Sequence, residues 1–158
     1  MSEDLRPQFA RDGFLVVPGL LEDALTAQVL EALRALIAAR FPTLEDDGDI
    51  HTLLRAAQAL DRGGLAAVYD AVRKTAAFWR LIGSPALQCI AQELLDTQAL
   101  GVAFHGAGIR LDLPGEDRWR SDWHQEYHAQ LTSQRGLVAW FPFADVDDSM
   151  GPVSIACG

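Results

Sequence analysis

The chain has 158 residues, of which 49% are hydrophobic and 22% are charged, so it is long enough for one globular domain with its own core. Its formal net charge of -9 argues against nonspecific binding to nucleic acid or to an anionic membrane surface. The two cysteines, Cys89 and Cys157, are too few and too far apart for a disulfide framework. We therefore expect buried free thiols in a reducing compartment.

The first residues and the hydropathy pattern place the protein in solution. Residues 1–7 are acidic and polar and lack the apolar centre of a signal peptide. No uncharged run reaches the roughly 20 residues that a membrane-spanning helix needs. These features predict a soluble, cytoplasmic protein that has no membrane partner.

Apolar residues at helical spacing dominate the first part of the chain. Those between Leu25 and Ile37 mark one face of a helix, and Pro42 limits its end. Ser84 is suited to the N-cap of a later helix, with Pro85 in its first turn. In chain order we expect a strand over residues 14–17, a helix from 25, an acidic loop over 43–49, and helices over 50–61, over 65–82 and from 85.

Short β-branched and aromatic runs separated by turn residues follow in the second part of the chain. They predict strands over residues 102–104, 108–113, 122–129, 137–141 and 153–157. Helices followed by consecutive strands are typical of the α+β class. We therefore expect one domain over residues 1–158, with a helical half at about 20–96 and a strand-rich half at about 100–158.

One strand carries residues suited to binding a metal. His124 and Glu126 are two positions apart, so they share one face of a strand and lie about 7 Å apart along it. An imidazole and a carboxylate at this spacing can bind one ion and supply two of the three ligands of the non-haem iron(II) facial triad. A pair of polar residues on a half-exposed strand is the alternative, because a single His-x-Glu often occurs by chance.

The third ligand of such a site has to come from another part of the chain. His128 shares the face, but it lies about 13 Å from His124 in a regular strand. Metal–ligand bonds of about 2 Å do not span that distance. His105, which precedes the strand, and His51, in the helical half, are the remaining histidines.

Five segments together resemble the phytanoyl-CoA dioxygenase family. The resemblance covers residues 9–158, nearly the whole chain, and the segments follow the family's order and approximate spacing. They are residues 9–21 (FARDGFLVVPGLL), 109–115 (IRLDLPG), 123–126 (WHQE), 137–146 (LVAWFPFADV) and 150–158 (MGPVSIACG).

This resemblance implies a fold and an activity. The fold is a double-stranded β-helix, the cupin-like jelly roll, with the N-terminal helices packed outside it. The activity is that of an iron(II)- and 2-oxoglutarate-dependent dioxygenase that uses O2 to hydroxylate a small-molecule or acyl substrate. His124 and Glu126 would hold the iron. Trp140 would line the co-substrate pocket or else pack in the core, and Arg110 would meet a carboxylate or else stay solvated.

The sequence departs from the family's pattern at two points. Glu126 stands where the family usually has aspartate, although glutamate is also a competent iron ligand. The family's distal histidine, and the arginine that pairs with 2-oxoglutarate, lie downstream of the position that matches Gly158. The resemblance therefore implies an incomplete domain, inactive as this fragment, that self-associates through open strand edges.

Two other functions remain open from the sequence. One is a non-catalytic remnant that acts in protein contacts. The other is a cupin-like metal-binding protein, although cupins usually bring several histidines close together.

Overall fold

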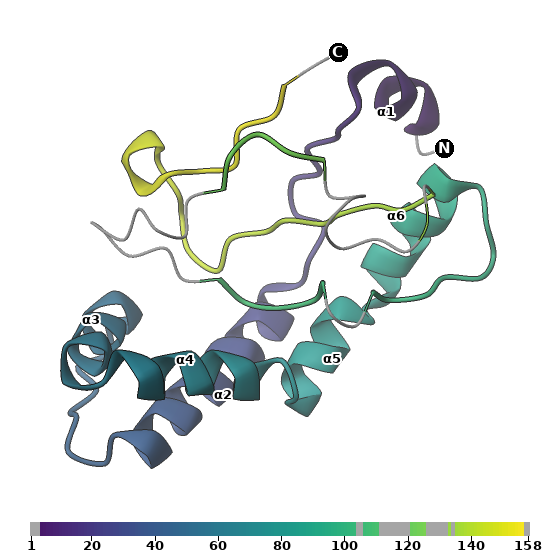
Figure 1. The fold of residues 1–158 in the computed structure, drawn as a ribbon. Coiled ribbons are helices and arrows are strands. Elements are labelled where there is room, and N and C mark those ends of the chain that lie inside the picture. Colours follow the sequence, from purple (N-terminus) through teal and green to yellow (C-terminus); the bar gives the residue numbers. More distant parts are fainter. Residues whose placement is uncertain (1–3, 104–105, 111–120, 126–132, 134, 157–158) are drawn as a thin grey trace. The chain divides into compact units, whose positions relative to one another are not determined.

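The computed structural model of the protein describes residues 4–103, 106–110, 121–125, 133 and 135–156 (Figure 1). The chain divides into two compact units. The first, here called the helical unit, consists of Asp23–Ile82 with Ala107–Arg120. The second, here called the terminal unit, consists of Met1–Glu22, Gly83–Gly106 and Ser121–Gly158. The sequence-based prediction of a single domain over residues 1–158 stays a prediction.

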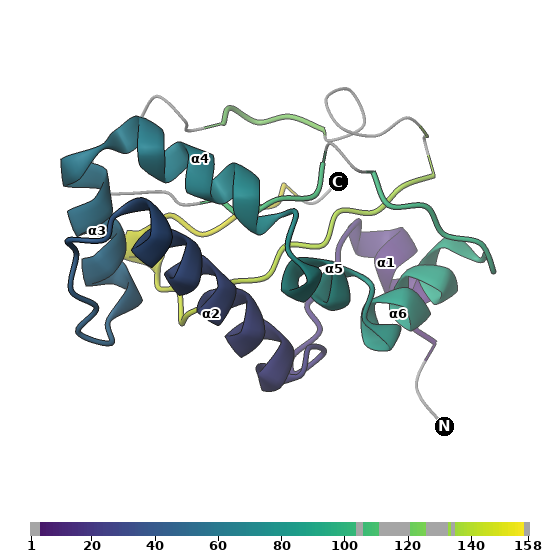
Figure 2. The same cartoon turned by 90° about the horizontal axis from the view of Figure 1, so that it is seen from below.

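The helical unit is built around one long helix. α2 (Asp23–Arg40) packs against α4 (Arg62–Val72) and α5 (Ala76–Ile82), and α3 (Ile50–Leu60) packs against α4. Figure 2 shows α4 as a neighbour of α2, which it crosses at an angle. The apolar face predicted for the first helix is the face that these neighbours cover, since Val29, Leu33 and Ile37 are buried.

All the buried hydrophobic side chains among the described residues lie in the helical unit. Each of its four helices contributes to this core, and Ile37, Leu65 and Leu81 are among the largest side chains that it encloses completely. Burial of such a side chain stabilises a fold by about 1.5–3 kcal/mol relative to exposure. The core residues are Val29, Leu33, Ile37, Phe41, Leu53, Leu54, Ala57, Leu65, Val68, Val72, Ala77, Phe78 and Leu81.

A capping threonine interrupts one of the predicted helices. The structure has two helices, α4 and α5, where one was predicted over residues 65–82. The prediction of one continuous helix was therefore wrong. The Thr75 hydroxyl donates to the Val72 carbonyl at 2.7 Å and accepts from the Phe78 amide at 3.2 Å. A threonine that satisfies backbone groups at both helix ends competes with helix continuation, which explains the break.

α4 begins at Arg62, three residues before the start predicted at residue 65. Asp61 has an extended backbone and its side chain accepts from the Gly64 amide at 2.9 Å, so it is the N-cap of α4. Asp61 also forms an ion pair with Arg40 of α2. A Cβ at Gly64 would lie 2.6 Å from the Asp61 carboxylate and 2.8 Å from the Arg40 guanidinium. Glycine in the first turn therefore leaves room for this pair.

The terminal unit contains two helices that contact one another. α1 (Arg6–Asp12) and α6 (Pro85–Leu95) are joined by a hydrogen bond from the Leu5 amide to Glu93 at 3.0 Å, and by an ion pair between Arg6 and Asp96 at 3.6 Å. Arg135 donates to the Leu95 carbonyl at the end of α6. A short 3₁₀ helix, η3 (Asp148–Met150), lies further along this unit.

Residues 4–20 differ from the sequence-based expectation. The sequence predicted a strand at residues 14–17, but these residues form no regular element, and α1 precedes them instead. Pro7 stands in the first turn of α1, and Gly13 ends it with a φ of 78° and an amide that donates to Phe9. Proline at the start and glycine just past the end of a helix are a recognised pattern, so this helix could have been predicted.

The α+β prediction is wrong for the described residues, which form an all-α structure without a β-strand. Residues 14–17 and 137–141 lack the predicted strands, and so do the described parts of the other four C-terminal segments. A partial jelly roll is therefore not the fold of this described part. The physical reason is that a strand exists only when a neighbouring segment completes its hydrogen-bond ladder, and an apolar run does not specify that neighbour.

The sequence predicted the middle helices well. The predicted helices near 25–37 and 50–61 are α2 and α3, and α6 begins at Pro85 after Ser84, as expected. Cys89 is a free thiol, as expected, but it is exposed rather than buried. No described helix is both long and apolar enough to cross a membrane.

Candidate functional site

His124 is the one member of the predicted metal pair that the structure describes. It lies in the irregular segment 121–125 of the terminal unit, and its side chain is exposed. Its Nδ1 atom lies 2.7 Å from the carbonyl oxygen of Asp122. Because a carbonyl only accepts hydrogen bonds, Nδ1 carries the proton, and in the neutral ring the lone pair is on Nε2. A metal-binding histidine usually has this second hydrogen bond, which fixes its tautomer.

The other proposed ligands cannot be placed beside His124. Glu126, His105 and His128 lie outside the described residues. His51 is described, but it belongs to the helical unit, at the start of α3. Among the residues that the structure describes, no three His, Cys, Asp or Glu side chains are grouped so that they could hold a metal ion.

The two residues proposed for co-substrate binding lie in different units. Trp140 belongs to an irregular segment of the terminal unit, and 54% of its surface is exposed. This exposure contradicts the alternative in which Trp140 packs in a core. Arg110 is exposed and belongs to the second segment of the helical unit.

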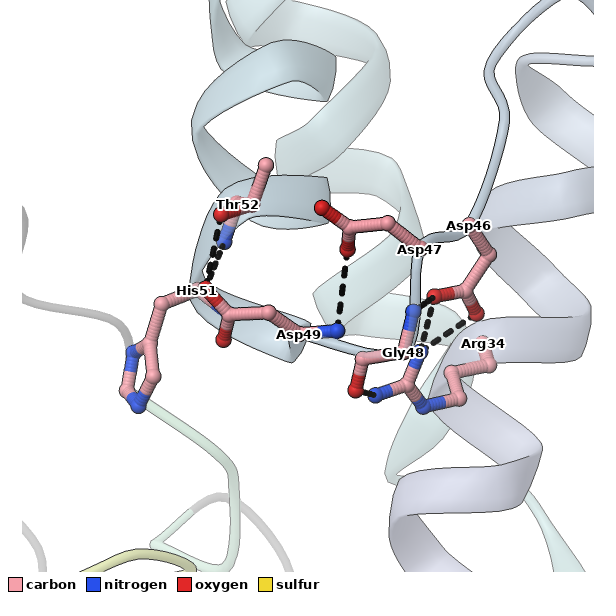
Figure 3. A network of polar contacts seen from close by, with 7 residues as sticks. All are labelled: Arg34, Asp46, Asp47, Gly48, Asp49, His51 and Thr52. Carbon is pink, nitrogen blue, oxygen red and sulfur yellow. Dashed lines mark hydrogen bonds and ion pairs between the residues drawn. The ribbon is translucent and has the colours of Figure 1, made fainter.

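A polar network in the acidic loop was not predicted from the sequence. The Arg34 guanidinium of α2 contacts both carboxylate oxygens of Asp46 and also donates to the Gly48 carbonyl at 2.7 Å (Figure 3). The hydrogen bond from Arg34, with a further one from the Gly48 amide, holds the pKa of Asp46 below its ordinary value. This network ties the loop to α2.

Asp47 and Asp49, the next carboxylates of the loop, form hydrogen bonds at the start of α3. Asp49 is the N-cap of this helix, because its side chain accepts from the His51 amide at 3.0 Å and from the Thr52 hydroxyl at 2.7 Å. The hydroxyl of Thr52, followed by the His51 amide, lowers the pKa of Asp49. Asp47 accepts from the Asp49 amide at 2.9 Å.

These contacts give the acidic loop a structural role. Each of the three aspartates accepts hydrogen bonds from its own chain, and the imidazole of His51 points away from them in Figure 3. Helix capping and the attachment of the loop to α2 account for the arrangement. A capping aspartate directly before a helical pattern is a signal that sequence reasoning could have used.

Comparison of the chain with protein-family models, with curated proteins and with solved structures found no match. The resemblance to the phytanoyl-CoA dioxygenase family therefore stays a prediction, and it rests on the residues quoted above. The functional argument depends on the chemistry of these residues.

Proposed function

We propose that the chain is an iron(II)- and 2-oxoglutarate-dependent oxygenase of the phytanoyl-CoA dioxygenase type, which acts in the cytoplasm on a small-molecule or acyl substrate. Five segments in the family's order support this proposal, with His124-x-Glu126 in the position of its metal motif. The observation that carries the proposal is the hydrogen bond between Nδ1 of His124 and the Asp122 carbonyl. The described residues do not form the jelly roll that this resemblance implies, so the proposal rests on the residue types and their spacing.

The donor set fits iron(II). Imidazole nitrogen together with carboxylate oxygen is the combination that non-haem iron(II) oxygenases use. Hydrogen bonding by the Asp122 carbonyl selects the tautomer of His124 whose Nε2 has the lone pair for a metal. His124 and Glu126 would therefore hold the ion as two of its three protein ligands.

The proposed reaction is a hydroxylation. A substrate C–H bond, O2 and 2-oxoglutarate give the alcohol, succinate and CO2, and bound iron supplies the activation of O2. The remaining task of the chain is to orient the two organic molecules and to exclude water. We assign Trp140 to the co-substrate pocket and Arg110 to the binding of a carboxylate, for which a guanidinium is well suited.

The test compares three alanine variants in an anaerobic iron(II) titration by calorimetry. We expect iron(II) to bind the chain weakly, with a dissociation constant no lower than the micromolar range, because two ligands lie on one segment. His124→Ala and Glu126→Ala should abolish this binding. His51→Ala removes an exposed histidine of the helical unit and serves as the matched control. Tight binding that is unchanged in His124→Ala would overturn the assignment of the ligands.

Succinate release under air, with added iron(II) and ascorbate, extends the same test to chemistry. We expect no measurable succinate from residues 1–158, because His124 and Glu126 supply only two of the three protein ligands that a facial triad needs. Turnover that is lost in both His124→Ala and Glu126→Ala would show that the site is complete within these residues or between two copies. If His51→Ala also lost activity, His51 would be the third ligand.

A second candidate function, in protein contacts, is favoured by the surface of the terminal unit. Ten large hydrophobic side chains of this unit are exposed among the described residues, whereas the helical unit exposes two, Leu60 and Trp79. A contact with another protein would remove such side chains from water, which favours binding. The ten are Val16, Leu100, Val102, Trp123, Val138, Trp140, Val146, Met150, Val153 and Ile155.

A further inference from the structure

We draw no further inference here: the strongest candidate, the shallow apolar groove of about 300 Å³ that Ala39, Gly64 and Ala71 line between α2 and α4, carries no proposal because nothing in the structure shows what covers it.

Discussion

The two units differ in how far their apolar side chains are buried. The helical unit buries every one of the hydrophobic core residues found among the described residues, and Ile37 at its centre has no exposed surface. The terminal unit has an isoleucine of the same chemistry, Ile155, with 52% of its surface exposed. Composition does not account for the difference, since apolar residues are plentiful in both units.

The difference shows how local and non-local structure depend on sequence. A helix satisfies its backbone within its own turns, so an apolar stripe on each helix is enough to bring α2, α3, α4 and α5 together. An extended segment satisfies its backbone only through a neighbour. Residues 137–141 and 153–156 have the composition of strands, but the structure describes them without regular pairing and with exposed apolar side chains.

The largest expected effect concerns independent folding. A peptide of residues 23–82 contains all the core residues named above, so we expect it to be helical and to melt cooperatively when heated. A peptide of residues 83–158 should show no cooperative transition, because its described residues bury no hydrophobic side chain. Circular dichroism during heating measures both. A disordered spectrum for the first peptide would mean that the helical unit needs the rest of the chain.

The same substitution, isoleucine to alanine, made once in each unit compares how much buried apolar contact each unit contributes to stability. Ile37→Ala should lower the free energy of unfolding by about 2–5 kcal/mol, because it leaves a cavity in a closed core. Ile155→Ala removes the same atoms from an exposed position, so the change should stay within about 0.5 kcal/mol. Urea unfolding followed by circular dichroism gives both values. Equal losses at the two sites would show that Ile155 is buried in solution.

Because the terminal unit exposes apolar side chains, we expect the protein to self-associate through this unit. The double variant Val153→Glu/Ile155→Glu should raise the dissociation constant of the self-associated protein at least about tenfold, since it introduces charge into an apolar contact. Leu60→Glu is the control, because Leu60 is equally exposed but lies in the helical unit. Sedimentation velocity over a range of concentrations measures the effect. A wild-type chain that is monomeric throughout would contradict the proposal.

The smallest expected effect is a pH dependence of the helical unit. The pKa of Asp46 is lowered by Arg34 and the pKa of Asp49 by Thr52. A carboxylate whose pKa is lower in the folded state stabilises the fold above the unfolded pKa, which for aspartate is about 4. This contribution is lost as the pH falls below that value, through the folded pKa.

Asp46→Asn isolates this contribution. The variant should be less stable than the wild type at pH 7, and the difference should shrink as the pH falls below about 4. Asp145→Asn, which changes an exposed aspartate of the terminal unit, is the control. Urea unfolding at several pH values measures the trend. A difference that stays constant with pH would show that Asp46 acts through packing rather than through its charge.

The fold could be predicted from sequence where the signals were local. Ile37 and its neighbours at helical spacing predicted α2, and Ser84 with Pro85 predicted the start of α6. The errors also had local causes, because Thr75 divides the predicted helix over residues 65–82 and Asp61 moves the start of α4. Both are capping residues that a closer reading of the sequence would have recognised.

The candidate site could be predicted only as a pair of residue types. Sequence spacing proposed His124 and Glu126 as neighbours on a strand, but the described segment around His124 is irregular and Glu126 lies outside the described residues. The Asp122 carbonyl that fixes the tautomer of His124 could not be foreseen, because any carbonyl in the chain can accept such a hydrogen bond.

By itself, the sequence determined α2, α3 and the start of α6, the apolar face of α2, and the residue types available for binding a metal. Hydrophobic periodicity and helix capping involve residues close together in the chain, so both can be recognised in a single sequence. The tertiary structure decided which apolar runs became buried, which carboxylates Arg34 and Arg40 engage, and that the predicted strands do not form in the described residues. Each of these outcomes depends on a partner distant in sequence, and the free energy of such a contact depends on how both segments are placed.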